Sequence, residues 1–200
     1  MTSLISSVIC TLLALVHAVL VVPRLPEPSE TEVGAEVLAV KPRYCDLRAP
    51  GFVGTTCLVA GVAGAASAAA PRWCLPLWWV WGGSVTALVS VDVRTTFLPR
   101  RLWFGCVGQA ALGTLVAAGI VAPGVHDLLP MLLFMALGAV GAALPFWLLW
   151  RFGGSLGYGD VRLAAGMGAV AASLGADAVM TSLLGATLVG AVISVGVTWR

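Results

Sequence analysis

Two acidic residues, Asp92 and Asp160, stand where a solvated surface charge does not explain them. Asp92 directly follows a long apolar run, and Asp160 directly precedes another. An ionisable group at the end of a membrane helix has a cost that pairing or function must offset. Two carboxyls brought together share one proton, so the charged one activates water as a general base and the protonated one donates to a carbonyl oxygen. The pair therefore predicts hydrolytic acid–base chemistry.

The residues in front of Asp160 favour the same interpretation. Gly157 and Gly159 flank Tyr158 just before the aspartate. Glycines there permit backbone angles closed to other residues and let an extended substrate strand come near. We therefore expect a flexible entry to a helix at this point.

Ion pairs are the simplest alternative for both aspartates: Asp92 with Arg94 or Arg101, and Asp160 with Arg162. Another alternative is an ion or proton site in a small ion-coupled transporter or a non-enzymatic membrane assembly subunit. Coupled transport usually places its charges near the middle of the bilayer. Both aspartates are predicted at helix ends, which favours catalysis.

A serine nucleophile of the rhomboid kind is a further alternative, because Ser155 lies in a Gly-Gly-Ser-Leu sequence. Such a serine needs a histidine base. The two histidines are His17, in the first apolar run, and His126, in a predicted outer turn. Neither is expected to reach Ser155, and His17 is interpreted as a polar group near the end of a bundle helix.

The elements that carry these residues are predicted to lie in a membrane. Of the 200 residues, 60% are hydrophobic and 10% are charged, whereas about 25% are charged in soluble domains. This composition excludes an ordinary soluble domain and a disordered chain, and a net charge of +2 is too small for nucleic-acid binding. The five cysteines form no Cys-x-x-Cys pair, so we expect no metal site and no cofactor.

Seven apolar runs predict an all-α, polytopic transmembrane bundle of about seven helices. The runs are 4–22, 52–70, 74–91, 102–121, 128–150, 161–174 and 178–199. Small residues within them, such as Gly64 and Gly138, predict close helix packing. The first run is expected to stay as a membrane helix because Arg24 follows it, whereas a secretory signal places its positive charge in front. The sixth run spans roughly 21 Å, which is short for a hydrocarbon core of about 30 Å.

The basic residues predict the orientation of the chain. Every Lys and Arg except Arg72 falls on one side of the predicted bundle. By the positive-inside rule that side is cytoplasmic, so the N-terminus lies outside and the C-terminus lies in the cytoplasm. We predict a first transmembrane helix over residues 1–22, a polar cytoplasmic loop over 23–51 and a six-helix membrane core over 52–200.

At the two aspartates the sequence resembles the type IV prepilin peptidases, which are membrane aspartyl proteases of the GxGD class. The first motif of that family, D-x-R-x-x-x-(I/L)-P, corresponds here to Asp92, Arg94, Leu98 and Pro99. The second motif, G-x-G-D-(V/I)-(K/R)-L, is matched in order by Gly157, Gly159, Asp160, Val161, Arg162 and Leu163. Residues 18–26 loosely resemble the segment after the family's first helix.

The resemblance implies that Asp92 and Asp160 are the catalytic pair of an endopeptidase. The supporting motif residues would be Gly157, Tyr158, Gly159, Arg94, Pro99 and Arg162. Such an enzyme lies in the bacterial cytoplasmic membrane and removes the leader peptide from pilin-like precursors. Larger members carry two Cys-x-x-Cys pairs in a cytoplasmic loop associated with N-methylation of the cleaved pilin. The loop at 23–51 has Cys45 only, so we expect neither a zinc site nor methyltransferase activity.

Overall fold

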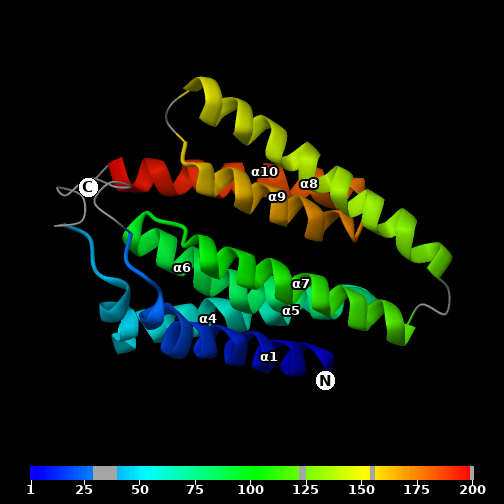
Figure 1. The fold of residues 1–200 in the computed structure, drawn as a ribbon, viewed down its shortest axis with the longest axis horizontal. Helices are drawn as coiled ribbons and strands as arrows, with labels where there is room; N and C mark the ends of the chain where they lie inside the picture. Colours follow the sequence, from blue (N-terminus) through cyan, green and yellow to red (C-terminus); the bar gives the residue numbers. More distant parts are fainter. Residues whose placement is uncertain (29–39, 122–124, 154–155, 199–200) are drawn as a thin grey trace. The chain divides into compact units, whose positions relative to one another are not determined.

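The computed structural model describes residues 1–28, 40–121, 125–153 and 156–198. All regular structure in these ranges is helical. Where helices that continue directly into one another are counted as one rod, the described residues form seven long rods, one for each predicted run, and the separate short helix η3 (Tyr44–Arg48). Figure 1 shows their arrangement within each unit. The rods long and apolar enough to cross a membrane within these ranges are Thr2–Arg24, Pro50–Ser67, Arg72–Thr95 and Leu129–Gly153. The predicted all-α membrane fold is confirmed, and the predicted orientation stays a prediction.

The chain forms two compact units, of which the first is Met1–Val121. Its first rod is α1 (Thr2–Val16), continued by η1 (His17–Val21) and η2 (Val22–Arg24), and its second is α4 (Pro50–Ser67). The third rod runs from η4 (Arg72–Cys74) through α5 (Leu75–Val80) and η5 (Trp81–Val85) to α6 (Thr86–Thr95), and the fourth is α7 (Arg100–Val121). Successive rods alternate in direction along this unit (Figure 1).

Glycines bring the backbone of α1 against its neighbours. A Cβ atom placed on Gly64 would lie 2.5 Å from the carbonyl oxygen of Ser6, and one placed on Gly83 would lie 2.7 Å from Cβ of Leu13. Both distances are shorter than van der Waals contact, so only glycine allows α4 and η5 to approach α1 this closely. The close packing predicted at Gly64 is confirmed.

Two rods of this unit contain a π-helical turn that the apolar runs did not predict. One is η1, which begins at His17, and the other is η5, which lies between α5 and α6. A π turn is wider than an α turn because its hydrogen bonds span five residues, and such turns are frequent at functional sites.

The described end of the polar loop folds back onto the end of the first rod. The short helix η3 (Tyr44–Arg48) packs against η2, and the backbone N–H of Tyr44 donates a 2.7 Å hydrogen bond to Oε1 of Glu27. Tyr44 and Leu47 are buried there. Glu30, Glu32 and Glu36 of the same loop lie outside the described residues.

The second unit is Ala122–Arg200 and contains α8 (Val125–Gly153), α9 (Tyr158–Ala172) and α10 (Ala176–Thr198). A Cβ atom placed on Gly138 of α8 would lie 2.5 Å from Cβ of Ala172 on α9, so the close packing predicted at Gly138 is also confirmed. The helix α9 begins at Tyr158 rather than at residue 161, which places Asp160 inside the helix.

Candidate active site

Asp92 lies in the last turn of α6, one turn before the helix ends. Its side chain is half-buried, whereas the neighbouring Val93 is 74% exposed. The helix ends at Thr96, which adopts a left-handed conformation with φ of 60° and donates its backbone N–H to the carbonyl oxygen of Asp92 at 2.6 Å. The apolar run therefore continues past Asp92 as helix, and the aspartate lies on a regular turn with a defined end.

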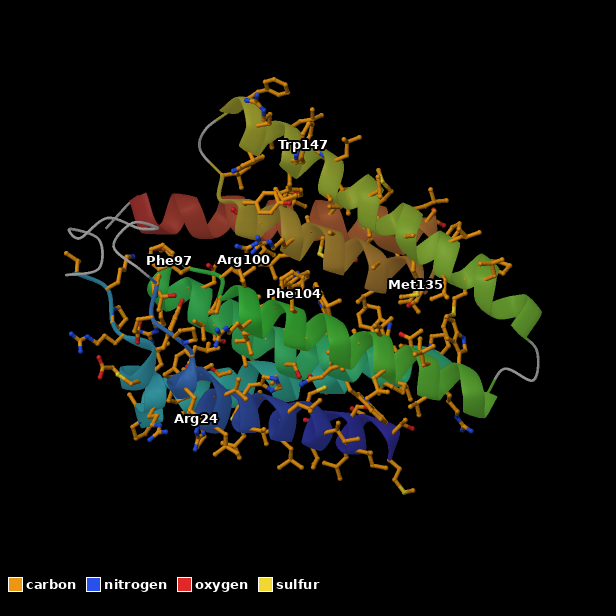
Figure 2. The ribbon with its side chains drawn as sticks, in the orientation of Figure 1. Arg24, Phe97, Arg100, Phe104, Met135 and Trp147 are labelled. Atoms are coloured by element: carbon orange, nitrogen blue, oxygen red, sulfur yellow. The ribbon has the colours of Figure 1, made fainter. Side chains whose placement is uncertain are left out.

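The turn between α6 and α7 is held from inside by Thr95, which is 1% exposed. Its hydroxyl donates to the carbonyl oxygen of Val91 at 2.9 Å and accepts a 3.3 Å hydrogen bond from the backbone N–H of Phe97. Figure 2 shows Phe97 in this turn, at the same end of the unit as Arg24. Thr95 was not among the predicted site residues, and the x positions of the first motif gave no signal for it.

The other predicted residues of the first motif lie on either side of this turn. Arg94 is exposed on α6, and Pro99 is half-buried directly before α7, where its carbonyl oxygen accepts a 3.0 Å hydrogen bond from the N–H of Trp103. The motif thus forms the corner between two helices, with Asp92 at one end and Pro99 at the other. The ion pairs considered for Asp92 stay predictions.

Asp160 lies in the first turn of α9 and is half-buried. Its Oδ2 accepts a 3.1 Å hydrogen bond from the backbone N–H of Gly157, the residue that precedes the helix. The carboxylate therefore caps its own helix, which fixes the direction of the side chain.

The ring of Tyr158 contacts two side chains beside this turn. Its centroid lies 5.0 Å from that of Trp150 at the end of α8, and the guanidinium carbon of Arg162 lies 4.8 Å from the same ring. The guanidinium of Arg162 thus lies over an aromatic face, and the hydrogen bond given to Asp160 comes from the Gly157 amide. This arrangement favours a packing role for Arg162 over the predicted ion pair with Asp160.

The conformational reason predicted for the glycines is wrong. Gly157 has φ of −77° and ψ of 150°, which any residue adopts, and Gly159 lies within α9. The glycine with a positive φ among the described residues is Gly175, between α9 and α10, with φ of 121°. The space at Gly157 accommodates a methyl group, because a Cβ atom there would meet Oδ2 of Asp160 at 3.6 Å and N of Gly159 at 3.9 Å, which are ordinary van der Waals contacts.

The two predicted catalytic residues belong to different compact units, so their pairing stays a prediction. Ser155 lies outside the described residues. His17 is 4% exposed and bonded within the first unit, through Nδ1 to the carbonyl oxygen of Leu13 and through Nε2 to the side chain of Gln109. In the part of the chain that the structure describes, no three His, Cys, Asp or Glu side chains gather as a metal site would require.

The helices and their composition define a multi-pass helical membrane protein with an aspartate at each of two helix ends. A sequence model of the type IV leader peptidase family matches residues 74–195, which is more than half of the chain and includes both aspartate motifs. The chain belongs to this family. No curated protein and no solved structure matches it.

Proposed function

We propose that the chain is an aspartic endopeptidase in which Asp92 and Asp160 act as one catalytic pair. The observation that carries this proposal is that the family match spans both motifs, and each motif contributes a half-buried aspartate at a helix end. A carboxyl that is partly buried and held on a helix is restricted in direction, which general acid–base catalysis requires.

In the proposed reaction the two carboxyls share one proton. The ionised carboxylate takes a proton from water, and the water oxygen attacks the scissile carbonyl carbon. The protonated carboxyl donates its proton to the carbonyl oxygen and so stabilises the developing charge. The C–N bond then breaks, and the leaving amine takes a proton from the pair.

The helix ends indicate which carboxyl carries the charge. Asp160 lies in the first turn of α9, and Asp92 lies in the last turn of α6. A helix N-terminus favours a negative charge and a C-terminus disfavours one. We therefore assign the general base to Asp160 and the proton donor to Asp92.

The proposed substrates are pilin-like precursors, cut after a short basic leader at the cytoplasmic face of the bacterial cytoplasmic membrane. Family membership supports this substrate class, and the basic residues of the predicted cytoplasmic side support the orientation. N-methylation of the product is not part of the proposal, because Cys45 is the one cysteine of the loop at 23–51.

The test is cleavage of a co-expressed prepilin by the variants Asp92→Asn and Asp160→Asn, followed by gel mobility and mass spectrometry. Neither variant is expected to process the precursor during expression. Asp177→Asn is the matched control, because Asp177 also lies in the first turn of a helix but is exposed. Full processing by both single variants would overturn the proposal.

A further inference from the structure

A chain of polar side chains crosses the first unit and is not explained by the two aspartate motifs. The hydroxyl of Ser84 donates to Oε1 of Gln109 at 2.7 Å, and Nε2 of Gln109 lies 3.3 Å from Nε2 of His17. Nδ1 of His17 lies 2.8 Å from the carbonyl oxygen of Leu13. With the proton of His17 on Nδ1, each of these three contacts joins a donor to an acceptor.

The two residues at the ends of this series of hydrogen-bonded side chains lie in the two π turns of the unit. His17 is the first residue of η1, Ser84 lies in η5, and Gln109 reaches both from α7. Ser84 and His17 are 0% and 4% exposed, so an unbonded polar group at either site would be buried without water. The hydrogen bonds of Gln109 on α7 therefore stabilise both π turns, η1 and η5.

The wide turn η5 determines which residues of α6 are buried, because α6 follows it directly. An α-helix turns by about 100° per residue. If η5 relaxed to an α turn, each residue of α6 would move into the place of the next one. Asp92 would then take the place of Val93, which is 74% exposed, and Val91, which is 0% exposed, would take the place of Asp92.

We propose that Gln109, together with Ser84 and His17, is a positioning residue for Asp92. It keeps η5 in its wide form and so sets the face of α6 on which the aspartate lies. This inference rests on the proposed catalytic role of Asp92. An apolar residue at position 109 removes the bonds to both π turns at once and still suits a membrane helix.

The first test compares Gln109→Leu with Thr114→Val in a cleavage assay with the purified full chain. A shift by one residue removes the Asp92 carboxyl from its place, so Gln109→Leu should lower kcat at least as far as Asp92→Asn does, on the order of 100-fold or more, with little change in KM. Thr114 is a matched control because it is buried on the same helix but donates only to its own helix, at the carbonyl oxygen of Ala110.

Deletion of Gly82 in the Gln109→Leu variant provides the decisive rescue. A turn with one residue fewer closes as an α turn and returns Asp92 to its original place, so cleavage should recover. A purely structural defect at position 109 would become worse with a second change. Unchanged cleavage by Gln109→Leu, or no recovery on deletion, would overturn the inference.

A second readout follows the register of α6 without relying on peptidase activity. In a background in which Cys45 and Cys57 are serine, Val91→Cys should resist a maleimide label while Val93→Cys reacts. Gln109→Leu should raise the labelling rate of Val91→Cys, because this residue moves from a buried place into the half-buried place of Asp92, and deletion of Gly82 should lower the rate again. A protected Val91→Cys in the Gln109→Leu background contradicts the inference. If the register shifts as expected but the wild-type protein cleaves no prepilin, the proposed peptidase function is wrong. The inference that Gln109 sets the register of α6 is then still supported.

Discussion

The corner at Asp92 and the helix start at Asp160 support similar carboxyls in opposite ways. Asp92 belongs to a turn fixed from inside by the buried Thr95 and by a left-handed residue, Thr96. Asp160 accepts one backbone hydrogen bond, and the neighbouring Tyr158, which is 45% exposed, contacts Trp150 and Arg162. The first site depends on the interior of its unit, whereas the second depends on contacts open to the surroundings. Changes near Asp160 should therefore alter substrate handling with little effect on stability, and changes near Asp92 should alter the fold.

The largest expected effect separates the two carboxyls by chemistry. With purified protein and long incubation, Asp160→Asn should lose on the order of 10⁴-fold in cleavage rate, because an amide cannot accept the proton of water. Asp92→Asn should lose less, on the order of 100-fold, because its amide still donates a hydrogen bond to the carbonyl oxygen. Equal residual rates, measured by mass spectrometry of the product, would contradict the assigned roles.

Removing the ring at position 158 tests the exposed support of Asp160. Tyr158→Ala loses the contacts to Trp150 and Arg162 and should lower the cleavage rate about tenfold, since such contacts each contribute about 1 kcal/mol. Tyr158→Phe keeps the ring and should retain most of the activity. A rate for Tyr158→Ala equal to wild type would show that the stack does not position Asp160.

Gly157→Ala tests whether substrate passes close to the backbone before α9. The structure accommodates the added methyl group without strain, so the melting temperature should stay unchanged. KM should rise on the order of tenfold, the low end of the 1–3 kcal/mol typical of one methyl group in a binding pocket. Measuring KM and Tm together separates a substrate clash from a folding defect, and an unchanged KM would contradict the close approach predicted from the sequence.

The smallest effect is expected at the corner after α6, and it concerns stability alone. Thr96 is β-branched and adopts a φ of 60°, which is unfavourable for its side chain. Thr96→Gly should raise the free energy of unfolding by about 0.5–1 kcal/mol and leave cleavage unchanged. A urea titration in detergent measures the change, and destabilisation would show that the hydroxyl of Thr96 matters more than its backbone.

Much of the architecture was predictable because the membrane imposes length and apolarity on each helix. All seven runs became helical rods, and the motif spacing located Asp92 and Asp160 at helix ends. The ends themselves were less accurate, since polar residues such as Asp160 continue a helix once their side chains cap it. Apolar length gives no information on where a helix begins within a polar motif.

The π turns and their bonds could not be predicted. Each π turn lies within an apolar run with no irregular spacing, and the contacts of Gln109 join segments 25 and 92 residues away in the chain. Such pairings depend on which helix faces meet, which a single sequence does not specify. His17 was accordingly interpreted only as a polar group near the end of a bundle helix, and the structure adds that it is buried and hydrogen-bonded.

The shortness of α9 makes bilayer thickness relevant to the chemistry. Its 15 residues span about 22 Å, compared with a hydrocarbon core of about 30 Å. A membrane-spanning helix of this length is accommodated by thinning of the surrounding lipids or by flanking residues that reach the interface, each at a cost of a fraction of a kcal/mol per Å. Because Asp160 lies at one end of α9, lipids with short acyl chains bring its carboxylate closer to the headgroups and to water, and lipids with long chains draw it inward. We therefore expect lipid composition to change the access of water to Asp160.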